Sequence, residues 1–143
     1  RTQTLLATPG VYLNPRLSPD GGRLAISSNS AEGSLLVYEL SRNSLTSLLT
    51  GSQRTTRPTW TPDGRFIVYR DKDGLRWVQA DGAGDSHPLL DSSKNTQTPG
   101  CFTADGKRLF YSETRLMQGG LRGNEIWSVP VICMQHVNGC GWQ

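Results

Sequence analysis

The chain lacks long apolar runs and lacks clusters of basic residues, and each absence narrows what it can be. No stretch of the 143 residues approaches the roughly 18 consecutive apolar residues of a membrane-spanning helix, and no signal peptide is recognisable. We therefore expect no membrane segment in this chain. The 15 basic and 12 acidic residues are intermixed and form no basic stripe, so we also expect no nucleic-acid partner.

Motifs for catalysis and cofactor binding are missing as well. The three cysteines are an odd number and too few for a disulfide scaffold. His87 and His136 lie outside any serine-hydrolase or zinc-protease motif, and Gly119–Gly123 lacks the Lys-Ser/Thr of a phosphate-binding loop. We therefore predict no catalytic residue, no cofactor and no enzymatic activity in the chain.

Two short patterns are loosely metal-like. Cys133, His136 and Cys140 have ligand-type spacing but supply only three ligands. Asp71-Lys72-Asp73-Gly74 resembles the start of a calcium loop but lacks the later acidic ligands, so a hairpin turn fits better. The sequence therefore predicts no metal site.

What the chain does contain is one turn motif that occurs three times. Each copy has Ser or Thr, then Pro or Ala, then Asp-Gly, and the Asp-Gly pairs are spaced 43 and 42 residues apart. Pro presets φ for a turn, Asp bonds back to the turn backbone and Gly takes a positive φ. A structural turn role is therefore predicted for Asp20, Gly21, Asp63, Gly64, Asp105 and Gly106.

Strand-like segments surround each turn and divide the chain into similar units. A period near 40–45 residues with four strands per unit is typical of propeller blades. Apolar runs after the turns predict second strands buried on both faces. An arginine precedes each run (Arg23, Arg65, Arg108), and third strands are aligned on Tyr38, Trp77 and Trp127. The predicted fold is all-β, a β-propeller fragment of about three four-stranded antiparallel blades, with essentially no helix.

The predicted boundaries follow the repeat. Residues 1–13 are expected to hold the last strand of a preceding blade (Thr2–Ala7) and a linker. Blade 1 is then 14–56, blade 2 is 57–97, blade 3 is 98–131 and incomplete, and 132–143 is an atypical tail. Three blades leave two open faces, which we expect to expose side chains such as Leu36, Tyr38, Ile126 and Trp127.

The segment Pro15-Arg16-Leu17-Ser18-Pro19-Asp20-Gly21-Gly22-Arg23-Leu24-Ala25 resembles the TolB-type, WD40-like propeller repeat, and the resemblance runs from Asn14 to Val131. It is most similar to the propellers that lie C-terminal to the membrane segment of bacterial serine/threonine kinases. The resemblance implies a non-catalytic interaction or sensor module, extracytoplasmic or periplasmic, with a protein or peptide partner and the remaining blades of a larger protein. The alternative is the gating propeller of a prolyl-oligopeptidase-like serine peptidase whose catalytic domain lies elsewhere.

Propellers bind through loops at either end of the central channel. One end here carries the three Asp-Gly turns. The other end carries the loops Asn29–Gly33, Asp71–Gly74 and Met117–Asn124. The sequence leaves open which end binds.

Overall fold

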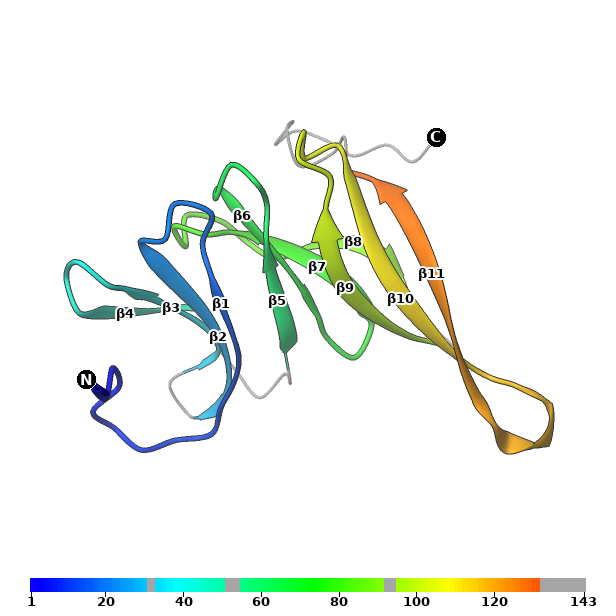
Figure 1. Ribbon diagram of the computed structural model, residues 1–143, viewed down its shortest axis with the longest axis horizontal. Coiled ribbons are helices and arrows are strands. Elements are labelled where there is room, and N and C mark those ends of the chain that lie inside the picture. Colours follow the sequence, from blue (N-terminus) through cyan, green and yellow to red (C-terminus); the bar gives the residue numbers. More distant parts are fainter. Residues whose placement is uncertain (31–32, 51–54, 92–94, 132–143) are drawn as a thin grey trace.

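The chain forms an all-β structure, as the repeat predicts. The computed structural model describes residues 1–30, 33–50, 55–91 and 95–131. Within these ranges it has eleven strands and one short 3-10 turn at Gln118–Gly120 (Figure 1). The strands are β1 (Tyr12–Leu17), β2 (Arg23–Ser30), β3 (Gly33–Glu39), β4 (Ser44–Leu49), β5 (Thr56–Trp60), β6 (Phe66–Arg70), β7 (Gly74–Gln79), β8 (His87–Asp91), β9 (Thr96–Phe102), β10 (Arg108–Leu116) and β11 (Arg122–Pro130).

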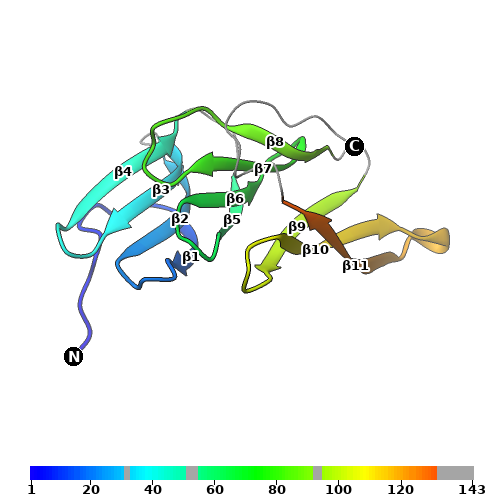
Figure 2. The same cartoon turned by 90° about the horizontal axis from the view of Figure 1, so that it is seen from above.

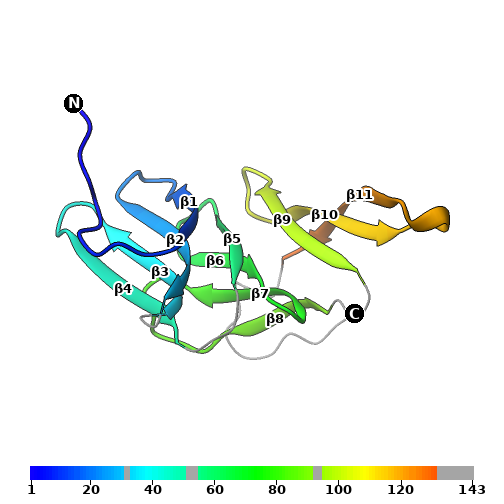
Figure 3. The ribbon, with the colours of Figure 1, turned by 90° about the horizontal axis from the view of Figure 1, so that it is seen from below.

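The strands build three antiparallel sheets in chain order. We call them blade 1 (β1–β4), blade 2 (β5–β8) and blade 3 (β9–β11). Figures 1 and 2 show the blades side by side, and Figure 3 shows the same arrangement from the opposite side. The first strand of each blade lies against the first strand of the next, β1 against β5 and β5 against β9. The predicted all-β fold of about three antiparallel blades is therefore confirmed.

The hydrophobic core lies in the two seams between blades. The seam of blades 1 and 2 contains Ala25, Leu35, Val37, Trp60, Ile67, Tyr69, Val78 and Ala80. The seam of blades 2 and 3 contains Phe66, Val68, Leu75, Trp77, Leu89, Leu109, Tyr111 and Val131. Strand β6 serves both seams with alternate side chains, which explains why its sequence is continuously apolar.

Blade 3 does not repeat that continuous burial. Leu109 and Tyr111 of β10 are buried against blade 2, whereas Phe110 between them is 39% exposed. The prediction of burial on both faces is therefore wrong for this strand. No further sheet lies on its outer face among the described residues.

The alignment of Tyr38, Trp77 and Trp127 as equivalent residues is also wrong. Tyr38 pairs with Leu24, Trp77 with Val68, and Trp127 with Tyr111. Counted from the Asp-Gly turn, these partners occupy three different positions along the second strand. The hairpins between the second and third strands differ in length. Aligning the third strands by their aromatic residues therefore assigns some of these residues to the wrong face of the sheet.

The arginines that follow the turns are not all equivalent either. Arg23 and Arg108 each open a second strand, at the position that Phe66 takes in blade 2. Arg65 lies one residue earlier, inside the turn. The grouping of Arg23, Arg65 and Arg108 is therefore corrected to Arg23 and Arg108 alone.

The segment before β1 forms no strand, contrary to the expectation for Thr2–Ala7. A fourth blade strand needs a third strand to complete its hydrogen bonds, and none lies beside this segment in the described chain. Residues 3–10 instead border a hollow against blade 1 that also includes Leu24, Ile26 and Tyr38. Leu36 and Tyr38 are buried, with 1% and 4% exposure, so their expected exposure is wrong.

The outer face and edge of blade 3 are exposed as expected. Ile126 is 74% exposed and shares the outer face with Phe110, whereas Trp127, 43% exposed, pairs with Tyr111 on the other face near the edge. Apolar sheet surface of this kind favours association. We expect the isolated chain to self-associate at micromolar concentration and the Ile126→Lys variant to be more monomeric, as measured by light scattering. An equally monodisperse monomer for both would contradict this expectation.

Candidate functional site

The end of the blades that carries the Asp-Gly turns is occupied by internal hydrogen bonds. In blade 2, Thr61 Oγ1 donates to Asp63 Oδ1 at 2.6 Å, and Arg65 N donates to the same oxygen at 3.0 Å. Gly64 has a φ of +68°. The same pattern recurs in the other blades at Ser18, Asp20, Gly21, Gly22, Thr103, Asp105, Gly106 and Lys107. The structure thus places all six predicted turn residues in three matching turns.

These hydrogen bonds also affect the turn carboxylates. The hydrogen bond from Ser18, together with the backbone N–H of Gly22, lowers the pKa of Asp20. The hydrogen bond from Thr103, together with the N–H of Lys107, lowers the pKa of Asp105 in the same way. Carboxylates committed to their own turn in this manner are not free ligand groups.

We expect Asp63→Ala to destabilise the protein by about 0.5–1.5 kcal/mol, because the turn loses its side-chain acceptor. Chemical denaturation measures the change. Asp73→Ala is a suitable control, since Asp73 lies in an exposed hairpin and its carboxylate contacts only Lys72. Equal midpoints for Asp63→Ala and the wild type would contradict a turn role.

The opposite end, which we call the hairpin face, carries the β6–β7 and β10–β11 hairpins. Between blades 2 and 3 it contains a hollow of about 240 Å³. The hollow is lined by Arg70, Asp71, Lys72, Gly74, Asn95, Thr96 and Gln97. The lining combines two cations with two amides and the carboxylate of Asp71, so this hollow is the candidate binding site.

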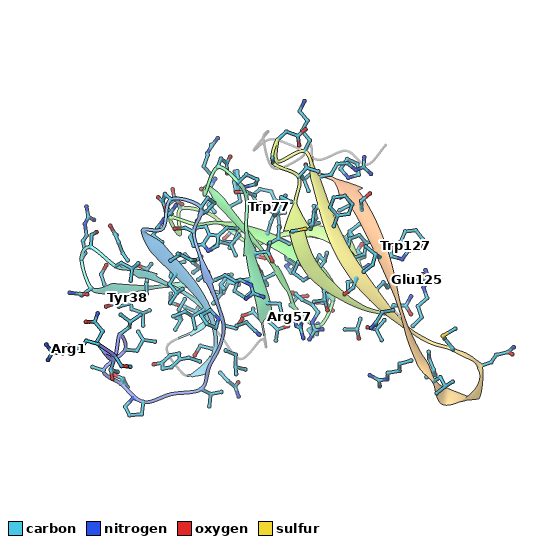
Figure 4. All side chains as sticks on the ribbon, viewed as in Figure 1. Arg1, Tyr38, Arg57, Trp77, Glu125 and Trp127 are labelled. Atoms are coloured by element: carbon cyan, nitrogen blue, oxygen red, sulfur yellow. The ribbon has the colours of Figure 1, made fainter. Side chains whose placement is uncertain are left out.

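Two arginines stand close together at this site. Arg57 lies in a β-bulge of β5, next to Thr56, whose Cα pairs with that of Arg70 on β6. The φ of Arg57 is +57°, a left-handed conformation that is uncommon for a residue other than glycine or asparagine. Figure 4 labels Arg57 near the beginning of β5, at the same end of blade 2 as the β6–β7 hairpin. Bulges of this kind redirect side chains.

In the part of the chain that the structure describes, neither arginine forms an ion pair with a carboxylate. Among the described residues, the ion pairs of arginine involve only Arg42, Arg76 and Arg115. Arg70 Nη1 donates to Thr98 Oγ1 of blade 3 at 3.4 Å. Burial lowers the pKa of Arg70, and the charge of Arg57 lowers it further, although a guanidinium stays protonated. The two guanidiniums are therefore close enough to repel each other, and neither forms an ion pair with a described residue.

A buried carboxylate organises the blade 3 side of the site. Glu113, 8% exposed, accepts hydrogen bonds from Asn95 Nδ2 at 2.9 Å, Gln97 Nε2 at 3.3 Å and Arg115 Nε at 2.9 Å. Burial raises the pKa of Glu113, but these hydrogen bonds outweigh it and hold the pKa below its ordinary value. Arg115 also pairs with Glu125 at 3.3 Å and lies over the Trp127 ring, which Figure 4 labels beside Glu125.

The lowered pKa of Glu113 makes a pH prediction. A group whose folded pKa is depressed stabilises the fold above its unfolded pKa of about 4.5, and this contribution is lost as the pH falls through the folded value. We expect Glu113→Gln to be less stable than the wild type at neutral pH and the difference to shrink below pH 4.5. Urea unfolding of both proteins across that range measures it; a constant difference would contradict the assignment.

The other candidates find ordinary structural roles. Asp71 Oδ1 accepts hydrogen bonds from the N–H groups of Asp73 and Gly74, and its other oxygen pairs with Arg76 at 3.5 Å, as in a hairpin turn. His87 stacks on Trp77 with ring centroids 4.6 Å apart. Gly119 and Gly120 lie in the β10–β11 hairpin. Cys133, His136 and Cys140 fall outside the described residues. Within those residues, no three metal-ligating side chains come together.

Sequence reasoning missed Arg57, Arg70, Gln97 and Glu113. One signal was present for Arg57, because Arg57-Pro58 stands where blade 1 has Asn14-Pro15, and Asn14 has a φ of +52°. An arginine at a repeat position suited to asparagine indicates a residue kept for its side chain. Arg70 occupies the position of Ser27 and Ser112 and is another such departure from the repeat.

Comparison with known proteins identifies the architecture. The chain matches no known family profile. It superposes on a putative TolB from Agrobacterium tumefaciens with a TM-score of 0.71 and 17% identity, over 89% of this chain and 48% of that one. TolB from Acinetobacter baumannii gives the same TM-score and identity over 92% of this chain and 32% of that one. The tricorn protease gives 0.62 and 15%, over 85% and 14%.

The three sheets are β-propeller blades. At these identities the likeness shows the TolB-like propeller fold and nothing about activity. The chain spans less than half the length of each of these proteins. No helix in the described part of the chain is long and apolar enough to cross a membrane.

Proposed function

We propose that the chain is a non-catalytic interaction module of a larger protein and that it binds its partner through the hairpin face. The observation that carries this proposal is the hollow between blades 2 and 3, beside which Arg57 and Arg70 form no ion pair with any acid in the described part of the chain. Arg70 is half-buried, and a charge that is partly removed from water costs free energy unless a partner compensates it. On the turn face the carboxylates are committed to their own turns, and Arg65 and Lys107 are exposed to solvent.

We propose that the larger protein is either a bacterial serine/threonine kinase, with this chain in its extracytoplasmic propeller, or a TolB-like envelope protein. The likeness to TolB supports the propeller and does not separate these two. The gating propeller of a serine peptidase stays the alternative, and the fold likeness to the tricorn protease is compatible with it. A His-Arg-Asp catalytic loop in the flanking sequence of the parent gene would favour the kinase, and Gly-x-Ser-x-Gly the peptidase.

A selection experiment tests the binding face. A library of random peptides is selected on the immobilised chain, and the selected binders are then measured on two double variants. Arg57→Asn/Arg70→Ser alters the hairpin face, and both replacements occur naturally at the same repeat positions (Asn14, Ser27). Arg65→Asn/Lys107→Ser removes the same charge from the exposed turn face.

We expect binders to lose affinity for the hairpin-face variant and to keep it for the turn-face variant. The reverse pattern would assign binding to the turn face and overturn the proposal. Peptidase and phosphotransferase turnover is expected to be absent in the wild-type chain. Turnover that persists through repurification and disappears in a His87→Ala variant would overturn the non-catalytic assignment.

A further inference from the structure

The hollow at the hairpin face has a second polar feature besides its cations. Gln97 lines the hollow and is only 6% exposed, yet its Oε1 has no hydrogen-bond donor in the described structure. Most buried side-chain oxygens have a partner, and one without a partner requires an explanation. A ligand that brings a donor into the hollow would supply the missing hydrogen bond.

The orientation of this amide is fixed by its neighbour. Gln97 Nε2 donates to Glu113 Oε2 at 3.3 Å, and Glu113 as a carboxylate only accepts. The lowered pKa of Glu113 keeps it in that form at neutral pH. The Gln97 oxygen is therefore held as an acceptor, and it requires an N–H or O–H from whatever occupies the hollow.

The cationic side of the same hollow requires an anion. Arg70 lines the hollow, whereas Arg57 is an exposed residue of the neighbouring bulge, close enough for its charge to lower the pKa of Arg70. The nearby acids are already engaged, Asp71 by Arg76 and by its own turn, and Asp73 by Lys72. Guanidinium groups hold carboxylates and phosphates with charge-assisted hydrogen bonds.

A ligand of this hollow therefore needs both a hydrogen-bond donor and an anionic group. We propose that the hollow binds the C-terminal residue of a peptide, with Arg57 and Arg70 holding its carboxylate and Gln97 Oε1 accepting its backbone N–H. The last residue of any peptide carries both groups a few bonds apart. Inorganic phosphate at neutral pH also carries a negative charge and an O–H, so it is the competing ligand that the experiment has to separate from a peptide end.

The size and lining of the hollow agree with a chain end. About 240 Å³ is smaller than the ~300–1,000 Å³ of pockets that enclose a drug-sized ligand. A terminal residue fits such a space while the rest of its chain continues over the surface. No aromatic side chain lines the hollow among the described residues, so the stacking platform of a single-stranded nucleic-acid site is absent there.

This inference rests on the proposed binding role of the hairpin face, and a minimal ligand tests it separately. N-acetylglycine carries one carboxylate and one adjacent N–H. Acetate lacks the N–H, and N-acetylglycinamide lacks the carboxylate. Each is titrated into the full chain by two-dimensional NMR, with the side-chain signals of Arg70 and Gln97 as reporters.

We expect N-acetylglycine to shift both signals with a dissociation constant on the order of 1 mM, since so small a ligand makes few contacts. Acetate and N-acetylglycinamide should each bind at least several-fold more weakly. Arg57→Asn and Arg70→Ser should each weaken N-acetylglycine by about tenfold or more. Arg42→Ala, which removes an exposed arginine of the β3–β4 turn, should not change it.

Any of the following results would overturn the inference. One is the absence of shifts at Arg70 and Gln97 with N-acetylglycine. Another is equal binding of acetate, or tighter binding of inorganic phosphate, which would leave a plain anion site. A third is unchanged binding in both Arg57→Asn and Arg70→Ser, provided their spectra remain well dispersed. Selected peptides that bind the hairpin face equally well as free acids and as C-terminal amides would keep the proposed function and remove only this inference.

Discussion

We expect the Trp77→Ala variant to lose about 3–5 kcal/mol of unfolding free energy, because a large side chain leaves a cavity in a packed seam. Trp77 is 4% exposed and belongs to the core between blades 2 and 3. Its ring meets Phe66 edge-on at 5.3 Å and stacks on His87 at 4.6 Å. A loss of this size is a large share of the ~5–15 kcal/mol that stabilises an ordinary domain.

Trp127→Ala is the matched control for this prediction. Trp127 is 43% exposed and lies at the edge of blade 3, where it contacts Glu125 and Arg115. We expect its removal to cost about 1 kcal/mol or less. Urea denaturation of both variants measures the difference, and equal losses would show that the seam between blades 2 and 3 is assigned wrongly.

The Gly64→Val variant is expected to lose about 1–3 kcal/mol from backbone strain, with a further loss at the seam. The φ of Gly64 is +68°, which a β-branched residue resists. An added Cβ would lie 3.2 Å from Arg23 Nη2, and the same atom donates to Gly64 O at 2.7 Å. The Arg23 guanidinium also lies 4.7 Å over the Trp60 ring, so its displacement disturbs the docking of blade 1 on blade 2.

Gly21→Val separates the two effects. Gly21 has a φ of +74° at the matching turn, but no atom lies within 4 Å of its added Cβ. We expect Gly21→Val to show the strain alone and Gly64→Val to lose more. Thermal and urea unfolding give both values; a loss for Gly21→Val as large as that for Gly64→Val would refute the seam contribution.

The turns and the repeat could be predicted from sequence because their signals are local. Asp and Gly specify the turn through bonds and backbone angles within a few residues, and the spacing of 43 and 42 residues then sets the strands. The seams followed from the continuous apolar run of β6. These features depend on neighbours in the chain or on a fixed period.

The candidate site could not be predicted because it joins residues that no local pattern connects. Arg57 comes near Arg70 through a bulge, and Gln97 meets Glu113 across the β9–β10 pairing. The register beyond a bulge or a hairpin of unknown length is not readable from one sequence. For the same reason the sequence aligned Tyr38, Trp77 and Trp127 wrongly. It also did not predict that residues 3–10 pack near the open face of blade 1.

The turn glycines have a consequence for how such arrays arise. Pro19 lies 3.8 Å from the Cβ position of Gly64, and Pro62 lies 3.6 Å from that of Gly106. Each turn thus presents a proline to the following turn and a glycine to the preceding one. When a gene segment encoding one repeat is duplicated in tandem, the copy carries both the proline and the glycine of this turn-to-turn contact. A new blade can then pack against its neighbour without a compensating mutation. Ala104 replaces the proline in the third turn, so a duplicate of that repeat would lack the proline side of the contact.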